Sequence, residues 1–173
     1  MSEGMEYSQA AAELLAAKLV ARLAVARRTI ACAESCTGGW IAQALTSVPG
    51  GSDVFPGGIV SYSNLAKTEL LGVSQDTLAE FGAVSEQTVR EMAMGARANF
   101  HSDYAVAVSG IAGPGGGTEE KPVGTVWIAW LSPEELRTQC FQFAGNRELV
   151  RIATVCEALR GFLHTHKPSA EQD

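Results

Sequence analysis

A serine, a cysteine and a threonine follow one another in a short polar segment, and their hydroxyl and thiol groups could act as nucleophiles. Residues 29–33 predict a buried strand before this turn, and residues 37–48 predict a helix after it. The first turn of a helix leaves backbone N–H groups unpaired, and these can stabilise an anion or a developing oxyanion. Ser35 is therefore a candidate nucleophile. The alternative is that Ser35 or Thr37 only caps the helix.

A base for this serine would have to be something other than histidine. The histidines follow a helix end or lie in the tail, which argues against a Ser-His-Asp triad: His101, His164 and His166. Lysine is the best candidate, provided that burial or neighbouring groups lower its pKa. Lys67 lies one turn into a predicted helix at 64–71, and Tyr62 precedes it at a strand end. The alternative is a solvated surface lysine beside a boundary aromatic residue.

Two arginines near the C-terminus could bind an anion. Arg147 and Arg151 are four residues apart on a predicted helix at 147–162, so they share one face. Arg147 opens that helix, where a cation opposes the helix dipole. A phosphate bound at the same place would make this position favourable, and arginine recognises phosphate well.

A long segment rich in glycine and proline, residues 110–124, follows Ser109 at the end of a predicted buried strand. In open α/β sheets, ligand-binding loops lie at such strand ends. The segment is neither a dinucleotide fingerprint, which would open a helix, nor a P-loop, which would need Gly-Lys-Ser/Thr. Fifteen residues without their own secondary structure are uncommon unless they have a function. The alternative is a flexible surface loop.

Composition limits the class of protein. The chain has 173 residues, 46% of them hydrophobic, which predicts one globular domain, residues 1–173, with a folded core at about 10–163. The net charge of −6 argues against nucleic acid as a partner. No segment reads as a signal peptide or reaches the ~18 apolar residues of a membrane span, so we expect a cytoplasmic protein with no membrane contact.

The four cysteines give no metal signature, because none forms C-x-x-C and no histidine pair accompanies them. We therefore expect no metal. Cys32, Cys140 and Cys156 lie in apolar runs and are expected to pack as small hydrophobic residues. Cys36 is the exception because it lies in the polar turn.

The hydrophobic pattern alternates between strands and helices. It predicts helices at 10–26, 37–48, 64–71, 74–81, 86–100 and 147–162, and strands at 29–33, 59–63, 104–109, 125–131 and 137–143. Strands flanked by helices, followed by two strands joined by a short turn, indicate an α/β sandwich with a mixed, mostly parallel sheet of about five to six strands. The last pair should be antiparallel, since only a short turn joins them.

Five segments in order resemble the CinA C-terminal domain family, which includes stand-alone nicotinamide mononucleotide amidohydrolases. They are AESCTGG (33–39), GGIVSYSNLAK (57–67), GAVSE (82–86), SGIAGPGGGTEEKPVGTVW (109–127) and FAGNR (143–147). The resemblance covers residues 10–163. Two positions differ from the usual family residue: Ser109 stands where threonine is common, and Gly116 where an acidic or polar residue is common. The larger family members carry an additional N-terminal domain for which this chain has no room.

The resemblance implies a three-layer α/β/α sandwich and hydrolysis of the carboxamide of nicotinamide mononucleotide to nicotinate mononucleotide and ammonia. This places the chain in pyridine nucleotide salvage, with no metal and no cofactor. By position, Ser35 matches the nucleophile, Tyr62 and Lys67 match the residues that activate it, and Arg147 matches the arginine that holds the phosphate. The expected substrate-binding residues are Cys36, Thr37, Gly38, Gly39, Ser109, Gly110, Gly113, Arg147 and Arg151.

Two other functions remain open. The domain could be a non-catalytic nucleotide sensor, which a lysine of ordinary pKa would favour. It could also be a hydrolase that uses Cys36, which would be sensitive to thiol alkylation but has no nearby histidine to activate the thiol. We expect a homo-oligomer, because apolar positions on the first and last helices could form an interface and because relatives commonly associate.

Overall fold

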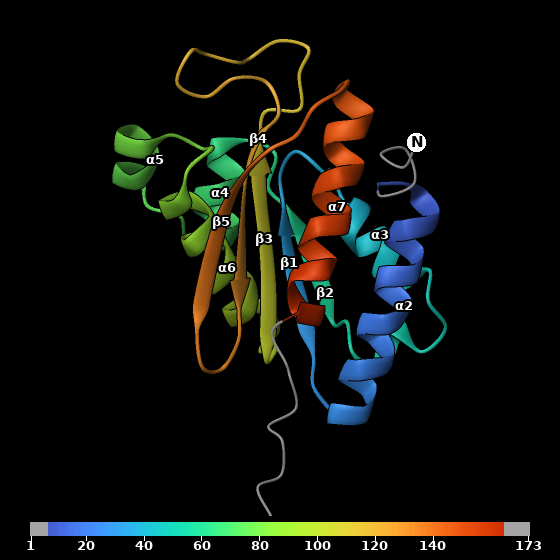
Figure 1. The fold of residues 1–173 in the computed structure, drawn as a ribbon. Helices are drawn as coiled ribbons and strands as arrows, with labels where there is room; N and C mark the ends of the chain where they lie inside the picture. Colours follow the sequence, from blue (N-terminus) through green and yellow to red (C-terminus); the bar gives the residue numbers. More distant parts are fainter. Residues whose placement is uncertain (1–6, 165–173) are drawn as a thin grey trace, which may run out of the picture.

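A twisted, open sheet separates two layers of helices (Figure 1). The computed structural model describes residues 7–164; the predicted N-terminal start and polar tail lie largely outside them. The strands in this range are β1 (Ile30–Glu34), β2 (Gly57–Val60), β3 (Tyr104–Gly110), β4 (Thr125–Leu131) and β5 (Leu136–Gln142). The helices are α2 (Gln9–Ala26), α3 (Trp40–Thr46), α4 (Asn64–Leu71), α5 (Gln75–Phe81), α6 (Glu86–Phe100) and α7 (Arg147–His164), with a short 3₁₀ helix, η1 (Gly51–Asp53). The predicted three-layer α/β/α sandwich is confirmed.

The strand order is β2-β1-β3-β4-β5, and the sheet is mixed as predicted. β1 runs parallel to both β2 and β3, whereas β4 is antiparallel to both β3 and β5. All five residues of β1 are buried, as expected of a central strand. The register pairs Glu34 with both Val60 and Val108. Three parallel strands therefore end side by side, and the chain segments that follow them meet at one edge of the sheet.

Each face of the sheet has its own hydrophobic core. Helices α2, α3 and α7 pack on one face, around residues such as Leu19, Ile41 and Leu159. Helices α4 and α6 pack on the other, around Leu71 and Met92. α6 crosses this second face and contacts every strand (Figure 1). It also contacts α4, so α6 sets the position of the helix that carries Lys67.

Several predicted boundaries differ from the structure: β2 ends at Val60 instead of residue 63, α3 ends at Thr46 instead of residue 48, and α7 continues to His164 instead of residue 162. Glycine explains two wrong starts. The helix predicted from residue 37 begins at Trp40, because Gly38 and Gly39 have φ angles of 62° and 101° and keep the turn out of the helix. The strand predicted from residue 59 begins at Gly57, where it pairs with β1. A Cβ atom at Gly58 would lie 2.3 Å from Cys32 Sγ, so glycine is needed for this close approach of strands.

The prediction for Cys140 was also wrong, since this residue is exposed on the edge strand β5. Cys140 lies in an apolar run of the sequence, but the fold does not cover it, because β5 has only one neighbouring strand. Cys32 and Cys156 are buried as predicted. Within residues 7–164, no helix combines the length and the apolar character needed to span a bilayer.

Gly95 allows the close packing of α6 against α4, and we expect Gly95→Ala to destabilise the protein. A Cβ atom there would lie 2.0 Å from the carbonyl oxygen of Leu71, a contact that requires the helices to separate. Alanine is intrinsically better than glycine in a helix by about 1 kcal/mol, so a fall in the melting temperature would mean that the clash outweighs this gain. Gly115→Ala is the control, because a Cβ atom at Gly115 has no neighbour within 4 Å. An increase in melting temperature for Gly95→Ala would contradict this account.

Candidate active site

Ser35 and Lys67 meet at the edge of the sheet where the parallel strands end. Lys67 Nζ lies 3.0 Å from Ser35 Oγ, within hydrogen-bond distance. Both side chains are buried, with 7% of Ser35 and 1% of Lys67 exposed. The alternative of a solvated surface lysine is therefore wrong. A hydroxyl and an amine in direct contact form the nucleophile-and-base pair that acyl transfer requires.

The start of α4 aims Lys67 at this serine. Ser63 caps the helix by accepting a hydrogen bond from the backbone N–H of Ala66 at 3.0 Å. Lys67 follows in the next turn, and helical side chains lean toward the N-terminus of their own helix. Its amine therefore returns to the strand end, where it also donates to the carbonyl oxygen of Ser61 at 2.7 Å.

Burial changes the chemistry of Lys67. Desolvation lowers the pKa of its amine below the ordinary value of 10.5, and a smaller interaction with Cys36 acts in the opposite direction. A lower pKa increases the neutral fraction at a given pH, and only the neutral amine can accept the serine proton. The environment of Lys67 thus favours a general base over an ordinary surface cation.

The backbone N–H groups at the start of α3 are occupied. The carboxyl group of Glu34 accepts hydrogen bonds from the backbone N–H groups of Ile41 at 2.9 Å and Ala42 at 3.0 Å. Gly39, with no side chain, is the N-cap residue, so neither Ser35 nor Thr37 caps the helix. The oxyanion donors must therefore come from the turn itself.

Three backbone N–H groups of the turn have no hydrogen-bond acceptor in the described part of the chain, those of Cys36, Thr37 and Gly39. The N–H of Gly38 donates to Ser35 O at 3.1 Å. The Thr37 side chain is fully buried and donates to Glu34 at 2.6 Å, so its hydroxyl faces the protein interior and not the ligand side. Its expected binding role is thereby limited to the backbone.

Cys36 lies next to the nucleophile, but its environment suppresses thiolate formation. Burial, with a smaller contribution from Glu34, raises the pKa of its thiol to about 12. The thiolate is the reactive form of cysteine, so this thiol is a poor nucleophile near neutral pH.

Arg151 binds the backbone of the turn that carries Ser35. Its guanidinium group donates to the carbonyl oxygens of Cys36 and Thr37, both at 3.0 Å, and lies 5.2 Å from the centre of the Trp40 ring. A Cβ atom at Gly38 would lie 3.4 Å from the guanidinium, which indicates how closely the arginine follows the backbone. In this arrangement, Arg151 orders the turn of Ser35.

Arg147 and Tyr62 form a separate, exposed pair. Arg147 donates to the carbonyl oxygen of Gly113 at 2.8 Å and to the Tyr62 hydroxyl at 3.1 Å. The tyrosine is 64% exposed. Among the described residues, its hydroxyl has no hydrogen bond to Ser35 or Lys67, so of the two alternatives, a Lys67 that acts directly or one that acts through Tyr62, this structure favours the direct one. Arg147 instead links Tyr62 to the glycine-rich loop between β3 and β4, which extends beyond the strand ends (Figure 1).

Ser109 and Gly110 support the site structurally and present little exposed surface to it. Ser109 is 1% exposed, and its hydroxyl donates to the carbonyl oxygen of Ala83 at 2.7 Å. A Cβ atom at Gly110 would lie 2.5 Å from a methyl group of Val126. Both residues therefore fix the base of the glycine-rich loop.

Sequence reasoning missed Glu34 and Ser61. Glu34 is 1% exposed and binds the start of α3, while Ser61 supplies the carbonyl oxygen that anchors Lys67. A glutamate directly after four buried residues was a usable signal, since a buried charge needs partners. Nothing in the local pattern pointed to the Ser61 carbonyl.

Comparison with known proteins shows the family of the chain. The model of the CinA C-terminal domain matches residues 12–166. This chain belongs to the CinA C-terminal domain family. Among its relatives is "Nicotinamide-nucleotide amidohydrolase PncC" of Enterobacter agglomerans, 53% identical over 132 residues that make up 76% of this chain and 80% of that protein.

Other family members are longer or have known structures. A "CinA-like protein" of Fervidobacterium nodosum is 54% identical over 123 residues, 71% of this chain, but the chain spans only 30% of its length. The crystal structure of the competence/damage-inducible protein CihA from Agrobacterium tumefaciens superposes with a TM-score of 0.87 at 42% identity, covering 88% of this chain and 94% of that one. The family fold therefore extends over nearly all of this chain.

Proposed function

We propose that this chain hydrolyses the carboxamide of nicotinamide mononucleotide, giving nicotinate mononucleotide and ammonia. The observation that carries the proposal is the buried pair of Ser35 and Lys67, with Nζ 3.0 Å from Oγ. Relatives about half identical to this chain are nicotinamide-nucleotide amidohydrolases, which supports the choice of substrate. The reaction belongs to pyridine nucleotide salvage.

The proposed reaction has two halves. Lys67 takes the proton of Ser35 as Oγ forms a bond to the carboxamide carbon, and then returns it to the departing nitrogen as the C–N bond breaks and ammonia leaves. Water next attacks the resulting ester, and Ser35 Oγ leaves with a proton. Unpaired N–H groups of the turn, among those of Cys36, Thr37 and Gly39, stabilise each oxyanion. Tyr62 acts at the substrate side, beside Arg147, and Lys67 serves as the base without a relay.

The positive pyridinium ring of the substrate assists this reaction. It withdraws electrons from the carboxamide and makes the carbonyl carbon more electrophilic. The protein can therefore use a modest base and the backbone donors of the turn, with no requirement for a metal or a cofactor.

Two observations weigh against the other functions. The lowered pKa of Lys67 suits a base and gives a purely binding sensor no advantage. The raised pKa of Cys36 disfavours a cysteine hydrolase.

Incubating the full chain with nicotinamide mononucleotide and separating the products by chromatography tests the proposal. Binding without formation of nicotinate mononucleotide would favour the sensor.

Arg147 is proposed to bind the substrate phosphate, and we expect Arg147→Ala to raise KM with a smaller effect on kcat. The guanidinium is on an exposed residue and lies 3.1 Å from the Tyr62 hydroxyl, and a hydrogen bond to a charged group contributes about 1.5–3 kcal/mol. That corresponds to roughly a tenfold or greater rise in KM. Steady-state kinetics with nicotinamide mononucleotide and with its riboside make the comparison. An equal loss on the riboside, which lacks the phosphate, would contradict the assignment.

Self-association stays a prediction. Exposed apolar side chains on α2 and at the start of α7, Leu14, Val25 and Leu149, are compatible with a homo-oligomer. Sedimentation of the full chain measures this directly.

A further inference from the structure

Glu34 combines two unusual features at the nucleophile turn. It is the last residue of β1 and directly precedes Ser35, yet it is only 1% exposed. A buried carboxyl group is unfavourable unless several donors satisfy it. The reaction proposed above assigns no role to this side chain.

The closest donors to the Glu34 carboxyl group come from the Ser35 turn and from the start of α3. One carboxyl oxygen accepts from the Thr37 hydroxyl at 2.6 Å and the Ile41 N–H at 2.9 Å, and the other from the Ala42 N–H at 3.0 Å. The turn from 35 to 39 is thus closed by a side chain from the strand before it onto the helix after it. The thiol of Cys32 adds a longer contact at 3.6 Å.

The backbone of Glu34 reaches the base as well. Its carbonyl oxygen accepts from the N–H of Ser61 at 2.8 Å, and the carbonyl oxygen of Ser61 accepts from Lys67 Nζ at 2.7 Å. Glu34 is therefore hydrogen-bonded through its side chain to the turn that carries Ser35. Through its backbone it is hydrogen-bonded to Ser61, which anchors Lys67.

We infer that Glu34 is a positioning residue that holds Ser35 within hydrogen-bond distance of Lys67. Because Glu34 occupies the N–H groups at the start of α3, the N–H groups of the turn are the ones that face the oxyanion. The inference rests on the proposed function, because it concerns the same Ser35 and Lys67. Glu34 itself touches neither reacting group. Its effect is on geometry, where an error of 1 Å can cost about 10²-fold in rate.

The test replaces the carboxyl group without changing its shape. In Glu34→Gln, one oxygen can still accept from Thr37 and Ile41, but an amide NH₂ then faces the N–H of Ala42. We expect kcat for nicotinamide mononucleotide to fall about 10²-fold with KM nearly unchanged. The rate at which a fluorophosphonate labels Ser35 should fall in parallel, since this probe reports nucleophile alignment without the substrate.

Thr37→Val provides a milder variant in case Glu34→Gln folds poorly. It removes one donor to Glu34 and keeps the side-chain shape, so we expect about a tenfold loss in kcat and labelling. Its side chain is buried away from the ligand, so KM should again stay close to that of the wild type.

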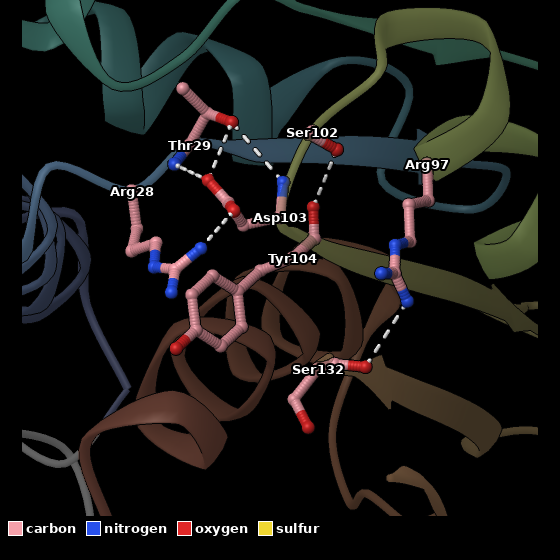
Figure 2. Close-up of polar contacts among 7 residues, drawn as sticks. All are labelled: Arg28, Thr29, Arg97, Ser102, Asp103, Tyr104 and Ser132. Atoms are coloured by element: carbon pink, nitrogen blue, oxygen red, sulfur yellow. Dashed lines mark hydrogen bonds and ion pairs between the residues drawn. The ribbon is translucent and has the colours of Figure 1, made fainter. Parts of the chain in front are cut away.

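A second carboxyl network at the opposite end of β1 supplies the matched control (Figure 2). Asp103 accepts from the N–H of Thr29 at 2.9 Å and from Arg28 at 2.6 Å, and joins the starts of β1 and β3. Asp103→Asn should reduce the melting temperature but leave kcat and the labelling rate unchanged. This separates a loss of fold stability from a loss of alignment.

The outcomes are distinguishable. Unchanged kcat and labelling in folded Glu34→Gln and Thr37→Val, or an equal fall in Asp103→Asn, would overturn the inference. If the wild type is labelled but does not hydrolyse the nucleotide, the proposed substrate is wrong and the labelling rates alone decide the role of Glu34. If the wild type shows neither labelling nor turnover, both the proposed function and this inference fail.

Discussion

Replacing Ser35 by alanine is expected to abolish hydrolysis of nicotinamide mononucleotide while leaving its binding nearly intact. The change removes the oxygen that attacks the carboxamide. Alanine leaves the contacts of Arg147 and of the glycine-rich loop unchanged. We expect a fall in kcat of at least about 10⁴-fold, in line with the loss of a nucleophile that acts together with its base. Product formation measured by chromatography, and affinity measured by calorimetry, give the two values.

Cys36→Ala is the matched control for this substitution. The two residues are adjacent and both are buried, but the thiol of Cys36 has a pKa of about 12 and is held in the unreactive form. We expect Cys36→Ala to retain most of the activity. Full activity in Ser35→Ala, or its loss only in Cys36→Ala, would transfer the nucleophile role to the cysteine.

Replacing Lys67 by methionine is expected to reduce kcat by about 10²–10⁴-fold, the usual contribution of a positioned general base. Methionine preserves most of the buried volume and removes the amine 3.0 Å from Ser35 Oγ. Affinity for the substrate should change far less than kcat, because Lys67 faces the serine and the Ser61 carbonyl. Lys18→Met, at an exposed position of α2, is the control and should be fully active.

The pH dependence of kcat gives this variant a second test. Only neutral Lys67 can take the serine proton, so kcat of the wild type should rise with pH through the pKa of this amine. Burial lowers that pKa, so the rise should come below 10.5. The residual activity of Lys67→Met should lack this step. The same step in both proteins would mean that another group is the base.

The same pKa shift predicts how folding stability responds to pH. Between the lowered pKa of folded Lys67 and the ordinary value near 10.5, the unfolded chain binds more protons than the folded one. The contribution of Lys67 to the free energy of unfolding must then rise with pH across that window. Buried cysteines with raised pKa values act in the opposite direction, so the informative quantity is the wild-type value minus that of Lys67→Met. This difference should increase with pH.

The order of strands and helices was accessible from the sequence because the hydrophobic pattern and the capping residues agreed. α4 and α6 have the predicted bounds, and the side chains of Ser63 and Ser85 cap them. The starts of α3 and β2 were not accessible. Both depend on glycines whose role is set by tertiary contacts: the turn before Trp40, and the approach of β2 to Cys32.

The candidate site was predictable to the level of residue type. The sequence singled out Ser35 and Lys67 as nucleophile and base, and the structure brings them together across 32 positions of the chain. It could not reveal the buried state of Lys67, which depends on the packing of α4 against α6. Nor could it tell that Glu34 takes the donors of α3, because that depends on the direction of one side chain.

The most direct test of the central claim is the release of ammonia from nicotinamide mononucleotide by the purified chain with a chelator present, measured beside Ser35→Ala. Release by the wild type alone is the predicted result and would support a metal-independent serine amidohydrolase. Equal release by both proteins would contradict the role of Ser35. No release by either, with the nucleotide bound, would contradict catalysis and leave a nucleotide sensor.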